Sequence, residues 1–563
     1  MPQLTHLRVF IGSVYIPKNI KHILDLYLFY STASLLVQTT MKPAQVQLSK
    51  RSVAKVMGVH RTFDFQKPYL QQNDIEFGGT AFFVDPNIFG EQFPSNFANK
   101  RIALTNFHVV DELYKRECYL CYPEKGKSKI TAKVIFIVPQ LDVAVLMVDP
   151  EGNHPLWFDS QDIKAFISCI PNLPIDDRSV KGNSQNVMAI GFPNLSSDYQ
   201  LCEGCISGRG HAMIQISISL NGGNSGGPLM MNGSVIGICT ASILDSEALG
   251  LAVPICQALR FFKHWASFKT TILTVPSWGM KTRTTSPDYL EYFGLERSTE
   301  GCSIHKMIPG GPADLSNLHE NDIILLVESD DTIYKVDNFG LISVDWTDKR
   351  VRLDNQEFIL SLNPQDIHVH VFDWKSQKNK RVTVKLHCIK YQVRDVHHCW
   401  EDVPYAILGG IVFMDLSKNH LEIDEEDEEE DDVEVEVVEV CQLMNFSNNS
   451  MYLKPAVIVT HIPAQTQVSC QQLLRSFDRV IKCNDQPVET VGQFQGMIKS
   501  AVKKYNKKYD RRDRFIVLET DRNKVYLNLE TLHARETVDS LEEHYPSNKC
   551  HLLKMKYKKR KRR

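Results

Sequence analysis

A chain of 563 residues is longer than one hydrophobic core usually supports, so we expect three or more domains of roughly 100–200 residues each. Apolar residues make up 43%, charged residues 23% and aromatic residues 9% of the sequence, which excludes a mainly disordered or collagen-like chain. Its fourteen cysteines are too few and too irregularly spaced for a disulfide scaffold, and they indicate thiols in a reducing compartment.

The first fifty residues lack turn signals and clear periodicity, and we interpret them as an N-terminal extension, with either Met1 or Met41 as the working start. The apolar stretch at 23–37 is shorter than the ~18 residues of a membrane-spanning helix and contains Asp25. No small-residue cleavage site follows it, so an amphipathic helix or a loosely ordered extension is favoured over a signal peptide.

From residue 51 to 268 the chain is dominated by short runs of alternating or clustered apolar residues with turn signals between them, which is typical of an all-β barrel or sandwich. The predicted strands are 52–60, 79–84, 101–104, 118–122, 130–138, 143–148, 187–190, 212–219 and 234–240. Residues 255–265 have apolar side chains at helical spacing and predict a terminal amphipathic helix.

The sequence pattern changes near residue 280, where a weak internal repeat begins. The segments 320–328 and 477–484 each place an acidic residue before an apolar strand and a polar turn, and each follows another apolar strand, at 302–307 and 456–462. We therefore predict two related modules, at 280–390 and 391–545.

Two strongly charged segments interrupt or follow the second module. Residues 422–439 contain 13 acids and no base, and removing them would change the net charge from −3 to +10. Residues 546–563 form a basic tail whose last ten residues include eight bases. Such blocks are usually solvated. The tail is a nuclear-targeting signal, a weak nucleic-acid contact, or a terminus without a partner.

The strongest chemical signal is the sequence NGGNSGGPL at Asn221–Leu229. Its four glycines and one proline specify a sharp turn that would expose the Ser225 hydroxyl and direct successive backbone N–H groups toward one point, where they could stabilise an oxyanion. The alternative is a glycine-rich surface turn in which the serine is only a cap.

A serine nucleophile needs a base. His108 stands at the end of an apolar strand, and Asp142 stands directly before another. Each residue alone could be structural, the histidine as a core side chain and the aspartate as a turn residue. The order His108, Asp142, Ser225 within one predicted β domain is, however, the order of chymotrypsin-like catalytic triads.

The segments LTNFHVVD, LDVAVLMV and NGGNSGGPLMMNGSVIGI resemble the three catalytic blocks of the Deg/HtrA serine proteases, and LGLAVP at 249–254 resembles the last strand of their protease domain. The resemblance covers about 50–545. Residues 405–416 and the unusual second module resemble most the plant-type Deg branch. The implied fold is mainly β: a chymotrypsin-like double β-barrel protease domain at 51–268 followed by two PDZ-like α+β domains.

The resemblance also implies roles for individual residues. Ser225 would be the nucleophile, His108 the general base and then acid, and Asp142 the residue that orients the imidazole. The N–H groups of Gly223 and Ser225 would form the oxyanion hole, with Asn224 shaping its turn. Three positions depart from the family pattern, and they put the resting activity in doubt without removing a triad member: Gly222 in place of proline, Leu141 in place of a small or polar residue, and Phe107 in place of Asn or Ala.

The primary pocket is predicted to be apolar or small, which favours cleavage after medium apolar residues. The predicted lining is Ile216, Ser217, Leu220, Ile238, Cys239 and Thr240. In the first PDZ-like module, the edge and carboxylate-binding turn for an extended peptide are predicted at Gly301, Cys302, Ser303 and Ile304. In the second module Pro455 removes a donor from the equivalent stretch, so this module is expected to be structural or oligomer-forming. The resemblance to Deg/HtrA proteases implies a homo-oligomer, a trimer or a multiple of it.

We expect neither a cofactor nor a metal. The pairs Cys118/Cys121 and Cys202/Cys205 have C-x-x-C spacing, but about eighty residues separate them and the first pair lies on a predicted strand, so small buried thiols are favoured over zinc.

The resemblance thus implies an ATP-independent endopeptidase acting on unfolded or damaged proteins, which we expect in the nucleus or cytoplasm or else in an organelle. The competing hypothesis is a catalytically weak protease-fold scaffold that binds peptides through its first PDZ-like module.

Overall fold

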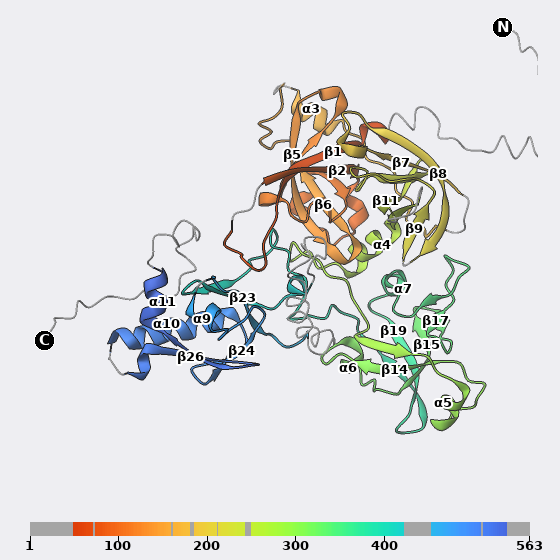
Figure 1. The fold of residues 1–563 in the computed structure, drawn as a ribbon. Helices are drawn as coiled ribbons and strands as arrows, with labels where there is room; N and C mark the ends of the chain where they lie inside the picture. The colour runs from red at the N-terminus through yellow and green to blue at the C-terminus, as the bar shows by residue number, and fades with distance from the viewer. Residues whose placement is uncertain are drawn as a thin grey trace, which may run out of the picture.

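The computed structural model describes residues 49–70, 74–158, 162–180, 185–210, 212–242, 249–421, 452–464, 466–507 and 511–536. Two closed six-stranded antiparallel β-barrels form its N-terminal part (Figure 1). In spatial order the first barrel contains β1 (Val53–Arg61), β2 (Asp74–Val84), β3 (Arg101–Thr105), β6 (Val143–Val148), β5 (Lys129–Val138) and β4 (Glu117–Cys121). The second contains β10 (Pro228–Met231), β11 (Ser234–Ser242), β12 (Gly250–Pro254), β9 (Met213–Ile216), β8 (Gln200–Gly210) and β7 (Asn186–Gly191).

Alternation along the strands separates the inside of each barrel from its surface. In β5, for example, Ile130, Ala132 and Val134 are buried while Lys133 between them is exposed. The C-terminal half of β5 is buried throughout, because Phe136 and Val138 belong to the core that joins the two barrels while Ile137 faces the core of the first. Strand β5 therefore contributes side chains to both cores.

Two strands differ from the sequence prediction. β8 was not expected, because its glycines and polar residues break any apolar alternation, and β10 is the short strand that follows the serine loop. The strand predicted at 212–219 is confined to β9. The predicted helix at 255–265 begins as α4 (Ile255–Arg260) and continues as a π-helical turn at Phe261–Trp265, with its buried side chains in the core that joins the barrels.

Each C-terminal module has a mixed α/β architecture around one antiparallel sheet. The first sheet has the order β13 (Met280–Arg283), β14 (Cys302–Met307), β15 (Ile323–Ser329), β19 (Ile367–Asp373) and β20 (Lys378–Thr383), with β16 (Thr332–Lys335) paired to β15. The second has the order β21 (Tyr405–Leu408), β22 (Ile411–Asp415), β23 (Val457–His461), β24 (Arg479–Cys483), β26 (Phe515–Thr520) and β27 (Lys524–Asn528), with β25 (Gln486–Pro487) paired to β24. The repeat predicted from sequence corresponds to β14 and β15 in one module and β23 and β24 in the other.

Helices and a small hairpin complete the two modules. These elements are α5 (Pro287–Tyr292), α6 (Pro312–Leu315), the hairpin of β17 (Leu341–Ile342) and β18 (Val351–Arg352), α7 (Gln356–Ser361), α9 (Gln467–Cys470), α10 (Val491–Lys507) and α11 (Leu529–Glu536); the protease domain adds α3 (Ile163–Ser168). In the second module α10 packs against β21 and β22, and β21 pairs with the outer edge of β22. In the first module β13 takes the place of β22, and no further described strand pairs with its outer edge.

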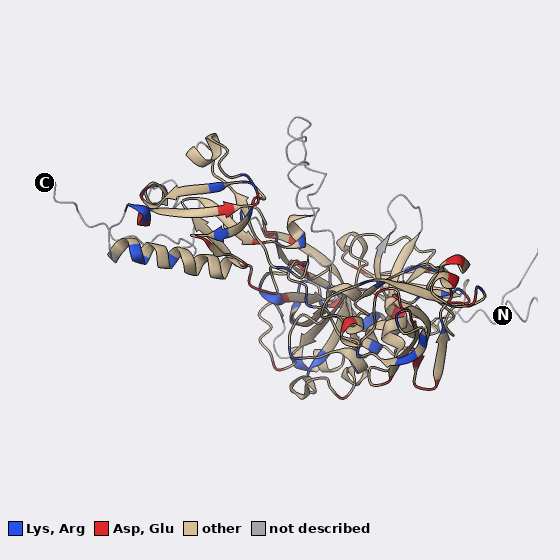
Figure 2. Ribbon diagram, turned by 90° about the horizontal axis from the view of Figure 1, so that it is seen from below, with Lys and Arg blue, Asp and Glu red and all other residues tan. Residues whose placement is uncertain are grey.

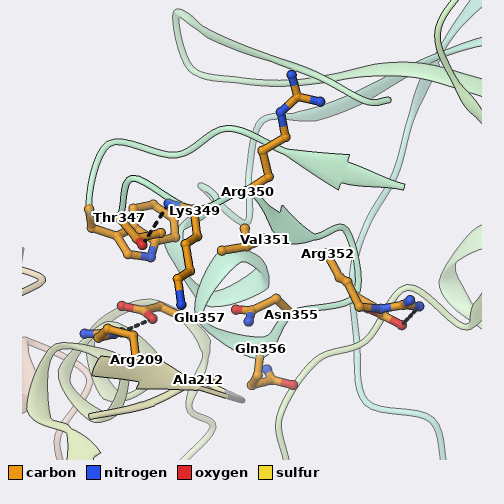
Figure 3. A pocket seen from close by; sticks show the side chains of 12 residues that line it. Arg209, Ala212, Thr347, Lys349, Arg350, Val351, Arg352, Asn355, Gln356 and Glu357 are labelled. Atoms are coloured by element: carbon orange, nitrogen blue, oxygen red, sulfur yellow. Dashed lines mark hydrogen bonds and ion pairs between the residues drawn. The ribbon is translucent and has the colours of Figure 1, made fainter. Parts of the chain in front are cut away.

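Both modules contact the protease domain (Figure 1). Helix α7 of the first module meets the second barrel, where Glu357 forms an ion pair with Arg209 of β8; the two side chains are 3% and 13% exposed. Figure 3 shows these two side chains directed toward each other beside a cavity of about 420 Å³ that Trp346 and Asn355 also line. The second module and its preceding segment meet the first barrel.

Acidic and basic residues are interspersed over most of the described chain, and several lysines lie within helix α10 (Figure 2). The acidic insert at 422–439, the basic tail and nearly all of the N-terminal extension lie outside the described residues. Within the described ranges, no helix is both long and apolar enough to cross a membrane.

Candidate active site

His108 and Asp142 face each other across the mouth of the first barrel. His108 lies on the turn after β3, and Asp142 ends the short 3-10 turn Pro139–Leu141 in a left-handed conformation (φ 52°). The Asp142 carboxylate oxygens lie 3.0 and 2.9 Å from Nδ1 of His108, and Oδ1 also accepts the backbone N–H of His108 at 3.0 Å. Because a carboxylate only accepts, it holds the proton on Nδ1 and leaves Nε2 as a base.

Thr240 on β11 gives the carboxylate a further donor. Its hydroxyl donates to Oδ2 of Asp142 at 2.5 Å, and Thr240 is 8% exposed. The sequence assigned this threonine to the substrate pocket, whereas the structure places its hydroxyl on the triad aspartate. The charge-assisted contact stabilises the ionised carboxylate in the orientation that binds His108.

Asn106 is a second contributor that the sequence analysis did not single out. Its side-chain amide donates to the backbone carbonyl of Asp142 at 2.9 Å, and its carbonyl oxygen accepts the N–H of Gly226 at 2.6 Å. Asn106 is fully buried, so one side chain ties the aspartate turn to the serine loop. The only sequence signal was a polar Thr-Asn step between an apolar strand and the histidine.

The serine loop has the sharp backbone that its glycines predict. Gly223 and Gly226 have φ values of +96° and +85°, and a Cβ on either would lie about 2 Å from a backbone oxygen, 2.2 Å from Phe192 O and 2.1 Å from Thr80 O. The hydroxyl of Ser225 donates to the carbonyl of Thr240 at 2.8 Å and not to His108. The structure thus brings Asp142 and His108 together, while the Ser225 hydroxyl remains turned to Thr240.

The backbone N–H groups predicted to form or shape the oxyanion hole differ in whether they already have a hydrogen-bond acceptor. Among the described residues, the backbone N–H groups of Gly223 and Ser225 have no protein acceptor, which leaves both available to an incoming oxygen. The N–H of Asn224 is bonded to Asn221 O at 3.0 Å, and its side chain is 4% exposed. Gly222 O accepts the N–H of Asn194. The oxyanion role of this loop stays a prediction.

The other predicted pocket residues lie mainly in the interior of the second barrel. Three of them, Ile216, Leu220 and Cys239, belong to its hydrophobic core, and Ile238 belongs to the core that joins the barrels. Ser217 is exposed, and its hydroxyl accepts the N–H of Cys205 at 2.9 Å. Most of these side chains pack inside the cores, so their positions do not show which of them would contact a substrate. The apolar cleavage preference stays a prediction.

The predicted peptide-binding edge was placed one strand too far into the sheet. Cys302, Ser303 and Ile304 lie on β14, which pairs with β13 on one side and β15 on the other. The N–H of Gly301 is already bonded to Asn338 Oδ1 at 3.0 Å. Among the described strands, the open edge on this side is β13, which pairs only with β14. The sequence analysis missed β13 because four residues between turns are too few to be recognised as a strand.

Among the described residues, one group of three potential metal ligands comes close together, and the predicted alternative at Cys118 and Cys121 does not form a second group. Burial raises the pKa of the Cys118 thiol to about 12, and Cys121, on the other face of β4, is half-buried, so these two thiols do not converge on one point. His319, Asp322 and Asp373 are close together, but the Lys380 ammonium lies 3.1 and 3.2 Å from the two carboxylates and supplies the positive charge itself.

Comparisons with known proteins agree with this geometry. Residues 79–238 match the family described as trypsin-like peptidase domain, and residues 395–528 match the PDZ domain family. The protease Do-like 12, mitochondrial, of Arabidopsis thaliana is 24% identical over 401 residues, 68% of this chain and 69% of the plant protein. A DegP-like periplasmic serine endoprotease of Pseudomonas putida is 28% identical over 251 residues, 42% of this chain and 46% of the bacterial one.

The chain therefore combines a trypsin-like peptidase domain with PDZ domains, and the relatives that it resembles are Deg/HtrA serine proteases. The fold prediction of a double-barrel trypsin-like domain followed by PDZ domains is confirmed. Among solved structures, the HtrA-type protease AlgW with decapeptide aligns with 61% of this chain and 97% of its own, at 19% identity and a TM-score of 0.41. The match to the bacterial endoprotease spans just under half of that protein's length.

Proposed function

We propose that the chain is an ATP-independent endopeptidase that cleaves unfolded or damaged proteins through an acyl-enzyme. The observation that carries the proposal is the Asp142–His108 pair, with the aspartate bonded to both the ring and the backbone of the histidine. The choice of unfolded substrates rests on what Deg/HtrA relatives imply. The domain limits at 51–268, 280–390 and 391–545 are part of the same proposal.

The chemistry needs one rearrangement of the present geometry. Rotation about the Cα–Cβ bond of Ser225 moves its hydroxyl from Thr240 O to Nε2 of His108. The Oγ atom then bonds to the scissile carbonyl carbon as its proton passes to Nε2, and the oxyanion is received by the N–H groups of Gly223 and Ser225. The imidazolium gives that proton to the leaving amine as the scissile C–N bond breaks. Water, deprotonated by the same ring, then bonds to the acyl carbon, and the ring returns the proton to Ser225 Oγ as the ester C–O bond breaks and the acid product leaves.

The scaffold hypothesis is kept as the second candidate because of the resting orientation of Ser225. A hydroxyl bonded to Thr240 O is not activated, and Gly222 allows the adjoining loop more backbone freedom than a proline would. If the rotation never occurs, the chain would bind peptides without cleaving them.

The peptide partner is proposed to bind the first module as an added strand on β13. β13 has a single described neighbour, β14, so its outer N–H and C=O groups are available for backbone pairing. In the second module the equivalent edge of β22 is already paired with β21, and Gln495 of α10 donates to Tyr405 O at 2.9 Å. This closed edge, and not Pro455, gives the physical reason for a structural second module.

Assembly and location complete the proposal. We expect a homo-oligomer, a trimer or a multiple of it, as the relatives imply, and a weak nucleic-acid contact only through the basic tail. The name of the plant relative places that protein in mitochondria. An organelle is therefore the main rival to the nucleus or cytoplasm, and a fluorescent fusion of the full chain distinguishes them.

The deciding experiment compares degradation of casein by the wild type and by Ser225→Ala. Both proteins are first shown to have the same fold and oligomeric state, and each is assayed with and without peptides that bind the first module. Degradation by the wild type alone supports the endopeptidase. Equal, negligible degradation under both conditions, with retained peptide binding, would reject it in favour of the scaffold.

A further inference from the structure

The segment between the two modules returns to the protease domain beside the catalytic histidine. Trp400, 4% exposed, is part of the hydrophobic core of the first barrel, together with Phe107 and Val110. Its indole N–H donates to the carbonyl of Asp111 at 2.7 Å. Arg116 fixes the segment from the other side, because its guanidinium donates to Trp400 O at 2.6 Å.

His397 contacts the same turn at two further points. Its ring packs edge-on against Phe107, with centroids 5.0 Å apart and planes at 83°, and its Nδ1 lies 3.2 Å from Oδ1 of Asp111. Phe107 directly precedes His108, and it is one of the positions at which this chain departs from the family pattern. The aromatic partner that explains this departure comes from almost three hundred residues further along the chain.

The turn that carries His108 has little internal support. Within residues 107–113 the backbone makes two hydrogen bonds, from Val110 to Phe107 and from Leu113 to Val110. Its position therefore depends on contacts from outside the turn. Asp142 holds the histidine itself, and Trp400 and His397 hold residues on either side. Strand β1 adds a contact of His60 Nε2 with Val109 O at 3.3 Å and a hydrogen bond from the Arg61 N–H to Glu112 O at 3.0 Å. A histidine displaced by even a fraction of an ångström loses the near-attack geometry that catalysis needs.

We propose that Trp400 and His397 are positioning residues for the catalytic base His108. The inference rests on the proposed endopeptidase function. It also gives the second module a catalytic role without a ligand of its own, because β21 begins five residues after Trp400 and its hairpin packs on Phe63 and Phe65 of the protease domain. Docking of that module and placement of the histidine are thereby coupled.

The test compares two test variants and one matched control variant of the full chain. Trp400→Phe keeps an aromatic ring and removes the donor to Asp111 O. His398→Phe likewise removes a ring N–H donor, but to Arg61 O at the end of β1, also at 2.7 Å, and keeps the stacking on Phe63. His397→Phe is the second test variant, because it keeps the edge contact with Phe107 and loses Asp111.

Three quantities are measured on each protein: the rate of phosphonylation of Ser225 by a fluorophosphonate, kcat and KM for a casein-derived peptide, and amide hydrogen exchange over residues 105–116. We expect Trp400→Phe and His397→Phe to lower kcat and the phosphonylation rate by about five- to twentyfold, with KM unchanged and faster exchange in the turn. His398→Phe should remain within twofold of the wild type in all three.

The outcomes separate the inference from the function on which it rests. Wild-type phosphonylation rates in both Trp400→Phe and His397→Phe would overturn the positioning role and leave the endopeptidase intact. An equal loss in His398→Phe would also overturn it, since general loosening of the segment would then explain the effect. A wild type that neither cleaves the peptide nor reacts with the fluorophosphonate would reject both proposals, whatever the exchange data show.

Discussion

The contact between Thr240 and Asp142 provides a quantitative test of how the triad is held. Thr240→Val is nearly isosteric and removes only the hydroxyl that donates to Oδ2 of Asp142 at 2.5 Å. The backbone carbonyl of residue 240, which accepts the Ser225 hydroxyl, is kept. Thr240→Ser is the matched control, because it retains a hydroxyl at the same place.

The expected effect follows from the value of a hydrogen bond to a charged group, about 1.5–3 kcal/mol. If the whole amount is lost from the transition state, kcat/KM falls roughly 10- to 150-fold. The Asp142 side chain is 21% exposed, so water can replace part of the lost donor, and the backbone and ring of His108 remain bonded to it. We therefore expect a loss near the lower end, about tenfold.

The assay is cleavage of a casein-derived peptide by both variants and the wild type, after circular dichroism has shown the same fold. Thr240→Ser should keep kcat/KM within about threefold of the wild type, because its hydroxyl can still reach the carboxylate. Equal activity of Thr240→Val and Thr240→Ser would refute the reasoning, since the hydroxyl–carboxylate contact would then contribute nothing to the reaction.

Three further predictions concern the serine loop and the domain contacts. Gly222→Ala should raise stability by about 0.4–1 kcal/mol without loss of casein degradation, because its backbone is not left-handed and no atom lies within 4 Å of the added Cβ; lost activity would show that the loop must bend. Arg209→Met should lower the free energy of unfolding, measured in urea, by about 3–5 kcal/mol, because it leaves the buried Glu357 carboxylate without its ionic partner. The double variant with Glu357→Leu should be nearly as stable as the wild type, and equal losses in the two variants would contradict this reasoning. Burial lowers the pKa of His420 from 6.5 to about 4, so the unfolded chain binds a proton at this residue at a higher pH than the folded chain. The free energy of unfolding is therefore unaffected by this group above pH 6.5 and falls by up to about 3 kcal/mol as the pH falls toward 4. Proteolysis of the loop at Phe65, whose carbonyl His420 binds, should increase between pH 7 and pH 5 in the wild type but much less in His420→Gln.

Much of the protease domain could be predicted from local pattern. The strands β1, β3, β5, β6 and β11 lie close to their predicted positions, because each has an apolar run bounded by turn residues. Alternation marks the inward side only where one face of the strand meets solvent, as in the first half of β5. β8 could not be found in this way, since its glycines hide the alternation and only its neighbours in the closed barrel make it a strand. The peptide edge at β14 was wrong for a related reason: whether a strand is internal depends on pairing with the short β13.

The candidate site shows the same division. His108, Asp142 and Ser225 were recognisable because glycines with enforced backbone angles and polar residues at strand ends leave a signature in the sequence itself. Asn106 and the contact of Thr240 with the carboxylate left no comparable signature, because Asn106 acts through partners 36 and 120 residues away and Thr240 through one 98 residues away.

The sequence by itself determined a β-rich first domain, two related modules and three candidate triad residues, because these depend on local propensity, apolar period and residue chemistry. The double-barrel protease fold was added by the resemblance to the Deg/HtrA proteases. Only the tertiary structure decided that the Ser225 hydroxyl rests on Thr240, that β21 closes the edge of the second module, and that Trp400 packs beside the turn of His108. Each of these depends on which distant surfaces meet when the barrels close and the modules dock, and burial against a distant surface leaves no period in the chain.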